Sequence, residues 1–158
     1  MGLDMYLYKR HYNEIYDFKK KSATAKKLTY KVFTEFEDGE TKEQTIEINN
    51  PEFSGATLTP FAYWRKANAI HRWILEATDS EDKCQLIYID GEKLKKLAEA
   101  CKTVLNNHDL AEEVLPTQQG FFFGDTDYDE YYFEELQRTY DMLKDIDWQD
   151  SFYYQASW

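Results

Sequence analysis

The sequence predicts a single α+β domain over residues 1–158, an antiparallel or mixed β-sheet covered by about three α-helices. Three observations predict this class. Apolar residues alternate with a period of two near both ends of the chain, which is typical of half-buried strands. Several longer segments between them place apolar residues three and four positions apart, as amphipathic helices do. The length of 158 residues suits one domain with a continuous core.

The first strand is expected at the very start of the chain. Leu3, Met5 and Leu7 alternate there with polar or aromatic neighbours. Residues 9–26 mix charged and small side chains, so they are predicted to form a loop or a weak helix.

A β-hairpin is predicted over residues 28–48. Asp38-Gly39 supplies turn residues between two runs of strand-forming side chains. Residues 51–58 are then expected to form a loop.

The first long helix is predicted to run from Pro60 to about Ala77. The hydroxyl group of Thr59 can cap its free backbone N–H groups, and Pro60 has no N–H to leave unpaired in the first turn. The residues expected on the buried face follow helical spacing: Tyr63, Ala67, Ile70, Ile74 and Ala77.

A second strand and helix pair follows. Residues 85–89 are predicted as a strand, after which Asp90 caps a helix that Asn106-Asn107 ends. A short helical piece is expected near residues 109–114. The inward side chains of the long helix are Leu94, Leu97, Ala98, Cys101, Val104 and Leu105.

The third long helix is expected after Asp127, because Asp127 and Glu130 have the spacing of a capping box. Its inner face is predicted to consist of Tyr132, Leu136, Tyr140 and Leu143. Residues 152–158 alternate again and are predicted as a closing strand. Cys84 and Cys101 form no C-x-x-C pair and are predicted to be buried reduced thiols, in a strand and a helix respectively.

The formal charge of −11 is confined to one segment. Residues 109–150 contain 13 acidic residues against Arg138 and Lys144, whereas acids and bases balance in the remainder. Such a segment repels nucleic acid, so direct nucleic-acid binding is not expected, and a basic protein partner or simple solubility are the uses left. No apolar run approaches the roughly 20 residues of a membrane span, and the N-terminus lacks a secretion signal, so a cytoplasmic location is expected.

A first candidate site lies on the predicted helix 60–77. Trp64, Asn68 and His71 have the spacing of one stripe beside the core face, where an indole, an amide and an imidazole could stack on and hydrogen-bond a planar group. Arg65 or Lys66 would add positive charge. Together with Tyr128 and Tyr131 these residues form a predicted site for a nucleotide or another anion. The alternative is that they are ordinary boundary residues bonded to nearby loops.

A second concentration of unusual residues begins at Gly120. The segment Gly120-Phe-Phe-Phe-Gly124 is predicted as a short buried strand. Asp125-x-Asp127-x-Asp129 resembles the start of a calcium loop but lacks its glycine and its bidentate Glu, so helix capping is expected instead of a metal site. No cofactor motif or catalytic constellation is found, and only a pairing of His71 with Asp127 or Asp129 is left open as an acid and base pair.

A third candidate is a stripe of carboxylates along the predicted third helix. Helical spacing would place them about 5–6 Å apart along the axis, comparable to phosphates along a nucleic-acid strand. A basic groove for DNA or RNA could accept such a stripe as a decoy; the alternative is a solvated helix face. The residues of this partner-binding stripe are Asp127, Glu130, Glu134, Asp141 and Asp145, interrupted by Arg138.

Four segments resemble one family across nearly the whole chain. The strings YWRKANAIHRW (63–73) and GFFFGDTDYDEYYFEEL (120–136), with the opening MGLDMYLYK and the ending FYYQASW, resemble small uncharacterised phage and bacterial proteins. The resemblance implies an accessory factor, such as an inhibitor of a host defence protein. Together with the acidic charge and the expected cytoplasmic location, it predicts a host protein with a basic surface as the partner, in the cytoplasm of a bacterial host. It implies no activity, and Asp125 stands where relatives more often carry Ser.

Three functions are therefore expected in order of preference. The first is a non-enzymatic inhibitor of a host protein, an acidic nucleic-acid mimic of the anti-CRISPR kind. The second is a small-ligand binding protein, and the third is a small enzyme that uses His71 with a carboxylate. The ligand site requires that helix 60–77 and the turn before residue 127 pack side by side.

Overall fold

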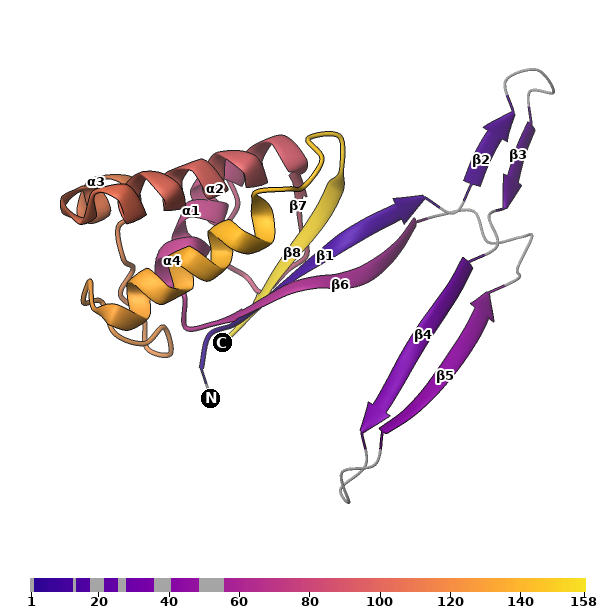
Figure 1. Cartoon of the computed structure of the whole chain (residues 1–158), viewed down its shortest axis with the longest axis horizontal. Coiled ribbons are helices and arrows are strands. Elements are labelled where there is room, and N and C mark those ends of the chain that lie inside the picture. The colour runs from indigo at the N-terminus through magenta and orange to yellow at the C-terminus, as the bar shows by residue number, and fades with distance from the viewer. Residues whose placement is uncertain (1, 13, 18–21, 26–27, 36–40, 49–55) are drawn as a thin grey trace. The chain divides into compact units, whose positions relative to one another are not determined.

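The computed structural model describes residues 2–12, 14–17, 22–25, 28–35, 41–48 and 56–158, with the side chains of 2–11 and 58–158 (Figure 1). It separates the chain into two compact units. The larger unit contains Met1–Arg10 and Leu58–Trp158, and the smaller unit contains His11–Thr57. A compact unit is a geometric grouping, whereas a domain folds independently, so the single domain over 1–158 stays a prediction.

The smaller unit consists of two antiparallel strand pairs. One joins β2 (Glu14–Asp17) to β3 (Ser22–Ala25), and the other joins β4 (Leu28–Glu35) to β5 (Thr41–Ile48). The predicted hairpin is therefore confirmed, although its Asp38-Gly39 turn lies outside the described residues.

The prediction of a loop or weak helix over residues 9–26 is wrong, because described parts of that segment are strands. β1 continues to Tyr12, and β2 and β3 follow. Backbone pairing decides the structure here, since the sequence of Ser22–Ala25 has no clear periodicity, whereas its backbone pairs with that of β2.

The larger unit is built on a four-stranded antiparallel sheet in the order β6-β1-β8-β7. Its strands are β1 (Asp4–Tyr12), β6 (Ala56–Arg65), β7 (Ile87–Asp90) and β8 (Ser151–Ser157). The strands predicted at the start of the chain, over residues 85–89 and over residues 152–158 are confirmed as β1, β7 and β8. The closing strand β8 is central: Asp4 of β1 lies opposite Ser157, and Ile87 of β7 lies opposite Tyr154.

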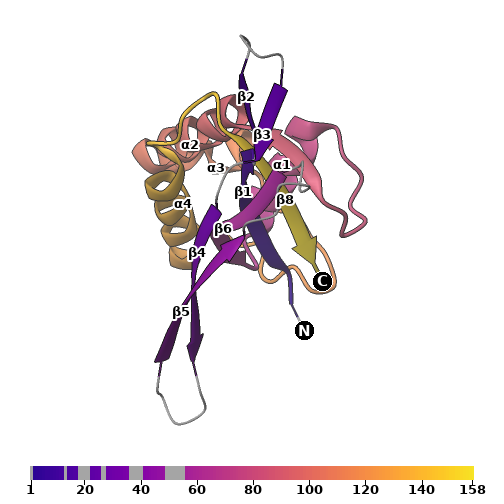
Figure 2. The same cartoon turned by 90° about the vertical axis from the view of Figure 1, so that its right-hand side faces the viewer.

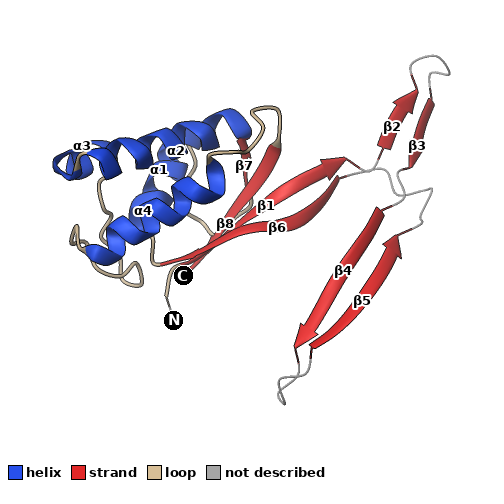
Figure 3. Ribbon diagram, in the orientation of Figure 1, coloured by secondary structure: helices blue, strands red, loops and turns tan. Residues whose placement is uncertain are grey.

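Helices cover one face of this sheet, as Figures 1, 2 and 3 show. They are α1 (Asn68–Thr78), α2 (Gly91–Asn106), α3 (Ala111–Val114) and α4 (Glu130–Leu143), with a 3-10 turn η1 at His108–Leu110. α2 and α4 pack against each other. The α+β class is thus confirmed. Among the described residues, none of the helices has the length and apolar character needed to cross a membrane.

The core lies between the sheet and the helices. Met5 and Leu7 of β1 and Phe152, Tyr154 and Ala156 of β8 are fully or almost fully buried, and the inward face of each helix joins the same cluster. The fully buried large side chains are Trp64, Tyr154, Phe152, Leu3, Met5, Leu7, Ile70, Ile74, Ile89, Leu94, Leu97 and Leu115. Cys101 belongs to this core, and burial raises the pKa of its thiol to about 12. Cys84 lies before β7 and is half-buried.

The prediction of a helix from Pro60 to Ala77 is wrong in its first half. Residues up to Arg65 belong to β6, and α1 begins only at Asn68. Trp64 is buried while Tyr63 is exposed and donates a hydrogen bond to Asp4 of β1, as the two-residue period of a strand requires. A proline is compatible with β6 because β6 is an edge strand of this sheet, where the outward-facing N–H groups have no ladder partner.

The loop predicted over residues 51–58 is wrong where the structure describes it, because β6 begins at Ala56. The buried strand predicted over residues 120–124 is also wrong. That segment is a turn in which Phe121 is 94% exposed and Phe123 is buried. Gly124 has a φ of +87°, a conformation that ends strand geometry and favours glycine.

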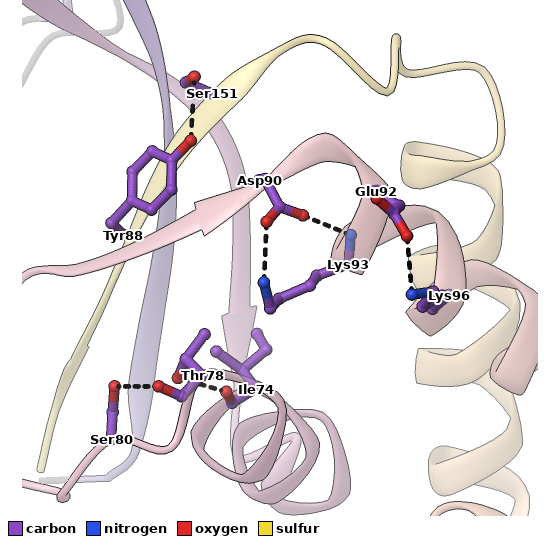
Figure 4. A network of polar contacts seen from close by, with 9 residues as sticks. All are labelled: Ile74, Thr78, Ser80, Tyr88, Asp90, Glu92, Lys93, Lys96 and Ser151. Carbon is purple, nitrogen blue, oxygen red and sulfur yellow. Dashed lines mark hydrogen bonds and ion pairs between the residues drawn. The ribbon is translucent and has the colours of Figure 1, made fainter.

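Helix caps were predicted with mixed success. The carboxylate of Asp90 accepts a hydrogen bond from the Lys93 N–H at 2.7 Å and pairs with the Lys93 ammonium at 2.8 Å, so the predicted cap of α2 is confirmed (Figure 4). The predicted cap at Asp127 is wrong. Asp129 caps α4 and accepts from the Tyr132 N–H at 2.9 Å, and the helix begins two residues later than expected.

A buried hydrogen bond joins the edge strand to α4. The Trp64 indole Nε1 donates to the Thr139 hydroxyl at 2.8 Å, and both side chains are fully buried. Thr139 in turn donates to the Glu135 backbone carbonyl at 2.7 Å. The bond satisfies the only polar atom of the buried indole.

We expect Thr139→Val to lower the free energy of unfolding by about 1–3 kcal/mol, because it leaves the Trp64 N–H buried without an acceptor. Thr103→Val is the matched control. Thr103 makes the same bond to the carbonyl four residues earlier, at 2.8 Å, but it is exposed on α2. Chemical denaturation of both variants checks this, and equal losses of stability would contradict it.

Candidate functional site

The side chain of Asn68 fastens the start of α1 to the loop that leads into α4. Its Nδ2 donates to the backbone carbonyls of Phe123 and Asp125 at 3.1 and 2.8 Å. Its Oδ1 accepts from the Gln118 N–H at 3.0 Å. The amide is buried, and all three bonds go to backbone groups of the loop. The amide thus satisfies N–H and C=O groups that would otherwise need partners in a helix or sheet.

A cavity of about 250 Å³ lies beside this junction. Its walls come from residues 66–67 and the first turn of α1, the first two turns of α4 and the loop that leads into α4. The packing of the helix against the turn before residue 127, on which the ligand-site prediction depends, is therefore observed, although the helix begins at Asn68.

Buried apolar side chains and more exposed acidic side chains line the cavity. Its apolar lining consists of Ala67, Ala69, Ile70, Tyr132 and Leu136. Four carboxylates line it as well, those of Asp125, Asp127, Asp129 and Glu135, against one ammonium among its described lining residues, that of Lys66. The cavity is thus negatively charged at neutral pH.

Glu135 is the most buried of these acids, with 13% of its side chain exposed. Its Oε1 accepts from Arg138 at 3.3 Å. Its Oε2 is buried and has no hydrogen-bond partner among the described residues. A buried carboxylate oxygen without a donor is a rare arrangement in folded proteins and marks a place where a donor would be stabilising.

Two tyrosines of α4 shape the cavity wall. Tyr131 donates to the Arg65 backbone carbonyl at 2.6 Å, and Tyr132 donates to the Leu115 carbonyl at 2.8 Å. Burial raises the pKa of both hydroxyl groups, and the nearby charge of Glu135 adds to the rise for Tyr131. Tyr128 packs edge-to-face on Tyr132, with ring centroids 5.0 Å apart. These contacts hold the rings of Tyr131 and Tyr132 in place.

The predicted ligand-binding residues divide into two groups. Lys66, Asn68 and Tyr131 line the cavity, and Tyr128 and Arg65 contact residues of its wall. Trp64 and His71 point into the core instead, because Trp64 lies on a strand and His71 on the buried face of α1. Whether the cavity residues bind a ligand stays a prediction.

His71 is 0% exposed and has a partner for each ring nitrogen. Its Nδ1 lies 2.6 Å from the Tyr154 hydroxyl, and its Nε2 lies 3.0 Å from Asp82 Oδ2. The other oxygen of Asp82 accepts from the Trp158 indole at 3.0 Å. The carboxylate beside His71 is therefore Asp82 and not Asp127 or Asp129, and this chain of bonds connects α1 to β8.

The carboxylates predicted as a partner-binding stripe are all exposed. Glu130, Glu134 and Asp141 lie on α4, whereas Asp127 precedes the helix and Asp145 follows it. Asp141 pairs with Lys144 at 2.8 Å and accepts from Gln137 at 3.0 Å, and these contacts lower the pKa of its carboxyl group.

Sequence reasoning missed two residues: Glu135, which lines the cavity, and Asp82, which bonds His71 in the core. Glu135 was outside the predicted stripe because it lies on the flank of α4 that turns toward the cavity. Asp82 lies in the segment between α1 and β7, where no periodicity predicts a partner. No group of three or more His, Cys, Asp or Glu side chains suited to a metal ion occurs within the described part of the chain.

We expect Asn68→Ala to lower the free energy of unfolding by about 2–3 kcal/mol, because three hydrogen bonds are lost and their backbone partners stay half-buried. Asn106→Ala is the control, since Asn106 is exposed at the end of α2. Urea unfolding measures both. A loss for Asn68→Ala no larger than that for the control would contradict the role of the amide.

Tyr154→Phe is expected to cost about 1–3 kcal/mol of unfolding free energy, because His71 Nδ1 stays in the core without its partner. Tyr153→Phe removes a hydroxyl group from the neighbouring residue of β8, on the opposite face of the sheet, and serves as the control. Thermal unfolding monitors both variants. Similar melting temperatures for the two would show that the His71 contact contributes nothing.

Comparison of the chain with protein-family models, with curated proteins and with solved structures gives no match. The resemblance to phage and bacterial proteins therefore stays a prediction. What the chain binds has to be inferred from the geometry and the charge of its own residues.

Proposed function

We propose that this chain is a non-catalytic binding protein whose outer α4 face and neighbouring acidic loop recognise a protein with a basic surface. The observation that carries the proposal is the position of the α4 carboxylates. Glu130, Glu134 and Asp141 are exposed and lie on the face of the helix directly opposite its buried face.

The geometry of an α-helix makes this face continuous. At about 100° per residue, Glu134 and Asp141 lie about 40° and about 20° from Glu130 around the axis. The buried residues of the helix are about 180–240° away on the same scale: Tyr132, Leu136, Thr139 and Leu143. A partner could therefore reach all three carboxylates without disturbing the core.

The acidic surface continues past the start of α4 into the loop. Asp125, Asp127 and Asp129 are exposed and precede the helix, so one short segment of sequence presents six carboxylates. A concentration of one charge on a rigid helix raises the association rate with a basic partner and limits the choice of partner. The neighbouring Lys144 neutralises part of this charge through its pair with Asp141.

The finer version of the proposal is a phage or prophage inhibitor that occupies the nucleic-acid groove of a host defence factor in the bacterial cytoplasm. The spacing of the carboxylates supports it only locally. Glu130 and Glu134 are about 6 Å apart along the helix axis, whereas Glu134 and Asp141 are roughly 10 Å apart. We therefore favour recognition of a basic protein surface in general, with competition against nucleic acid as the test of mimicry.

The two alternative functions gain less support. A site for a nucleotide or another anion needs positive charge, but the cavity carries four carboxylates and one described ammonium. A His71-based enzyme needs access to the imidazole, which is fully buried with both nitrogens bonded.

The test is affinity capture from a bacterial lysate at low ionic strength, using the wild-type chain and a triple variant with Glu130→Gln, Glu134→Gln and Asp141→Asn. We expect a basic protein captured by the wild type to bind the triple variant about tenfold or more weakly. This difference in affinity should become smaller at high salt, which screens the charges. Binding of DNA or RNA to that protein is then measured with and without the wild-type chain.

The control variant carries Glu99→Gln, Glu112→Gln and Glu113→Gln, which remove the same charge from exposed positions of α2 and α3. Retained binding by the control supports the α4 face. Equal losses by both variants would reduce the effect to net charge and refute a specific surface. If a partner is captured but the chain does not compete with nucleic acid for it, the proposal of a basic-surface binding protein stands and the proposal of nucleic-acid mimicry is refuted.

A further inference from the structure

The cavity beside Asn68 combines features that suit one kind of chemical group. Its lining includes buried apolar side chains, the rings of two tyrosines and an excess of carboxylates. We infer that it binds the guanidinium side chain of an arginine carried by the basic partner. This inference rests on the proposed function and assigns a specific contact to it.

The size of the cavity favours a side chain over a larger molecule. Its volume is about 250 Å³, below the roughly 300–1,000 Å³ of pockets that bury drug-sized ligands. An arginine has a short alkyl stem and a flat polar end. The apolar floor formed by Ala67, Ile70 and Leu136 suits the stem, because long charged side chains bury their methylene groups against apolar surface.

The charge of the cavity favours a cation. Four lining carboxylates against the Lys66 ammonium leave three negative charges in excess, so a single positive group would be attracted. A guanidinium group carries five N–H donors in a planar fork, which allows it to bond several carboxylates at once. An ammonium group lacks that planar geometry, which is why an arginine is favoured over a lysine.

Glu135 is the acid expected to make the deepest contact. Its side chain lines the cavity with 13% of its surface exposed, and its Oε1 accepts from Arg138. A guanidinium group in the cavity would add a second charge-assisted contact to this carboxylate. The ring of Tyr131, which lines the cavity and is fixed by its bond to the Arg65 carbonyl, offers a face on which the guanidinium plane can stack.

The test uses n-butylguanidinium, which carries the alkyl stem and the charged end of an arginine, and n-butylurea, its neutral counterpart. Each is titrated into the full chain at low ionic strength while backbone amide chemical shifts are recorded. We expect saturable shifts for butylguanidinium in residues 66–70, 124–129 and 135, and no saturable shifts there for butylurea. Absence of the first set, or equal effects of both compounds, would overturn the assignment.

Glu135→Gln is expected to weaken butylguanidinium binding about tenfold. Glu134→Gln is the matched control: it removes the same charge one residue earlier, from an exposed side chain that does not line the cavity. Equal affinities of the two variants would refute the role of Glu135. Because the wild-type comparison of the two compounds needs no variant, the site stays testable if Glu135→Gln fails to fold.

The cavity and the α4 face can fail separately. Butylguanidinium binding depends on residues that the triple variant on α4 leaves unchanged. Capture of a basic partner without butylguanidinium binding would refute the arginine site and leave the proposed function. Butylguanidinium binding without a partner that depends on the α4 face would support a cation site and remove the partner as its source, which also overturns the arginine assignment.

Discussion

The three hydrogen bonds of the Asn68 amide are the constraint on which the site depends. They hold the backbone at Gln118, Phe123 and Asp125 against the first turn of α1. The same loop delivers the chain to Asp129, which caps α4. One buried side chain therefore joins the first turn of α1 to the loop that forms the facing wall of the cavity.

The sheet of the larger unit supports the contact between α1 and the loop before α4. β8, the last strand in the sequence, lies between β1 and β7, so the sheet is complete only when the C-terminal segment has paired. The bonds from Tyr154 through His71 to Asp82 then connect β8 to the helix that carries Asn68. The rigid site is thus a product of contacts far apart in the sequence.

Local patterns predicted those parts of the fold in which periodicity and burial agree. Residues 3–8 and 152–156 alternate, and the helix after Asp90 has both a cap and a clear apolar face, so these elements were predicted correctly. The prediction of a helix over residues 60–67 was wrong, because apolar spacings that fit a buried helix face also occur by chance in a strand rich in aromatic residues. Pairing with β1, which no local pattern contains, decides in favour of the strand.

The candidate site could be predicted only in outline. Lys66, Asn68 and Tyr131 line the cavity as the sequence suggested, but Trp64 turns into the core because a strand reverses its side chains at every residue. The position of Glu135 in the cavity lining could not be predicted, because tertiary packing decides which flank of α4 faces the cavity. The contact of Asp82 with His71 in the core could not be predicted either, because it joins a loop to a buried helix face.

The most direct test of this account is hydrogen exchange at two neighbouring amides of the wild-type protein. The Gln118 N–H donates to Asn68 Oδ1, whereas Gln119 is exposed in the same loop. If the Asn68 amide holds the loop, Gln118 exchanges at least about tenfold more slowly than Gln119 after correction for intrinsic rates. Equal and fast exchange at both amides would show that the loop is not held, and the cavity would lose its wall.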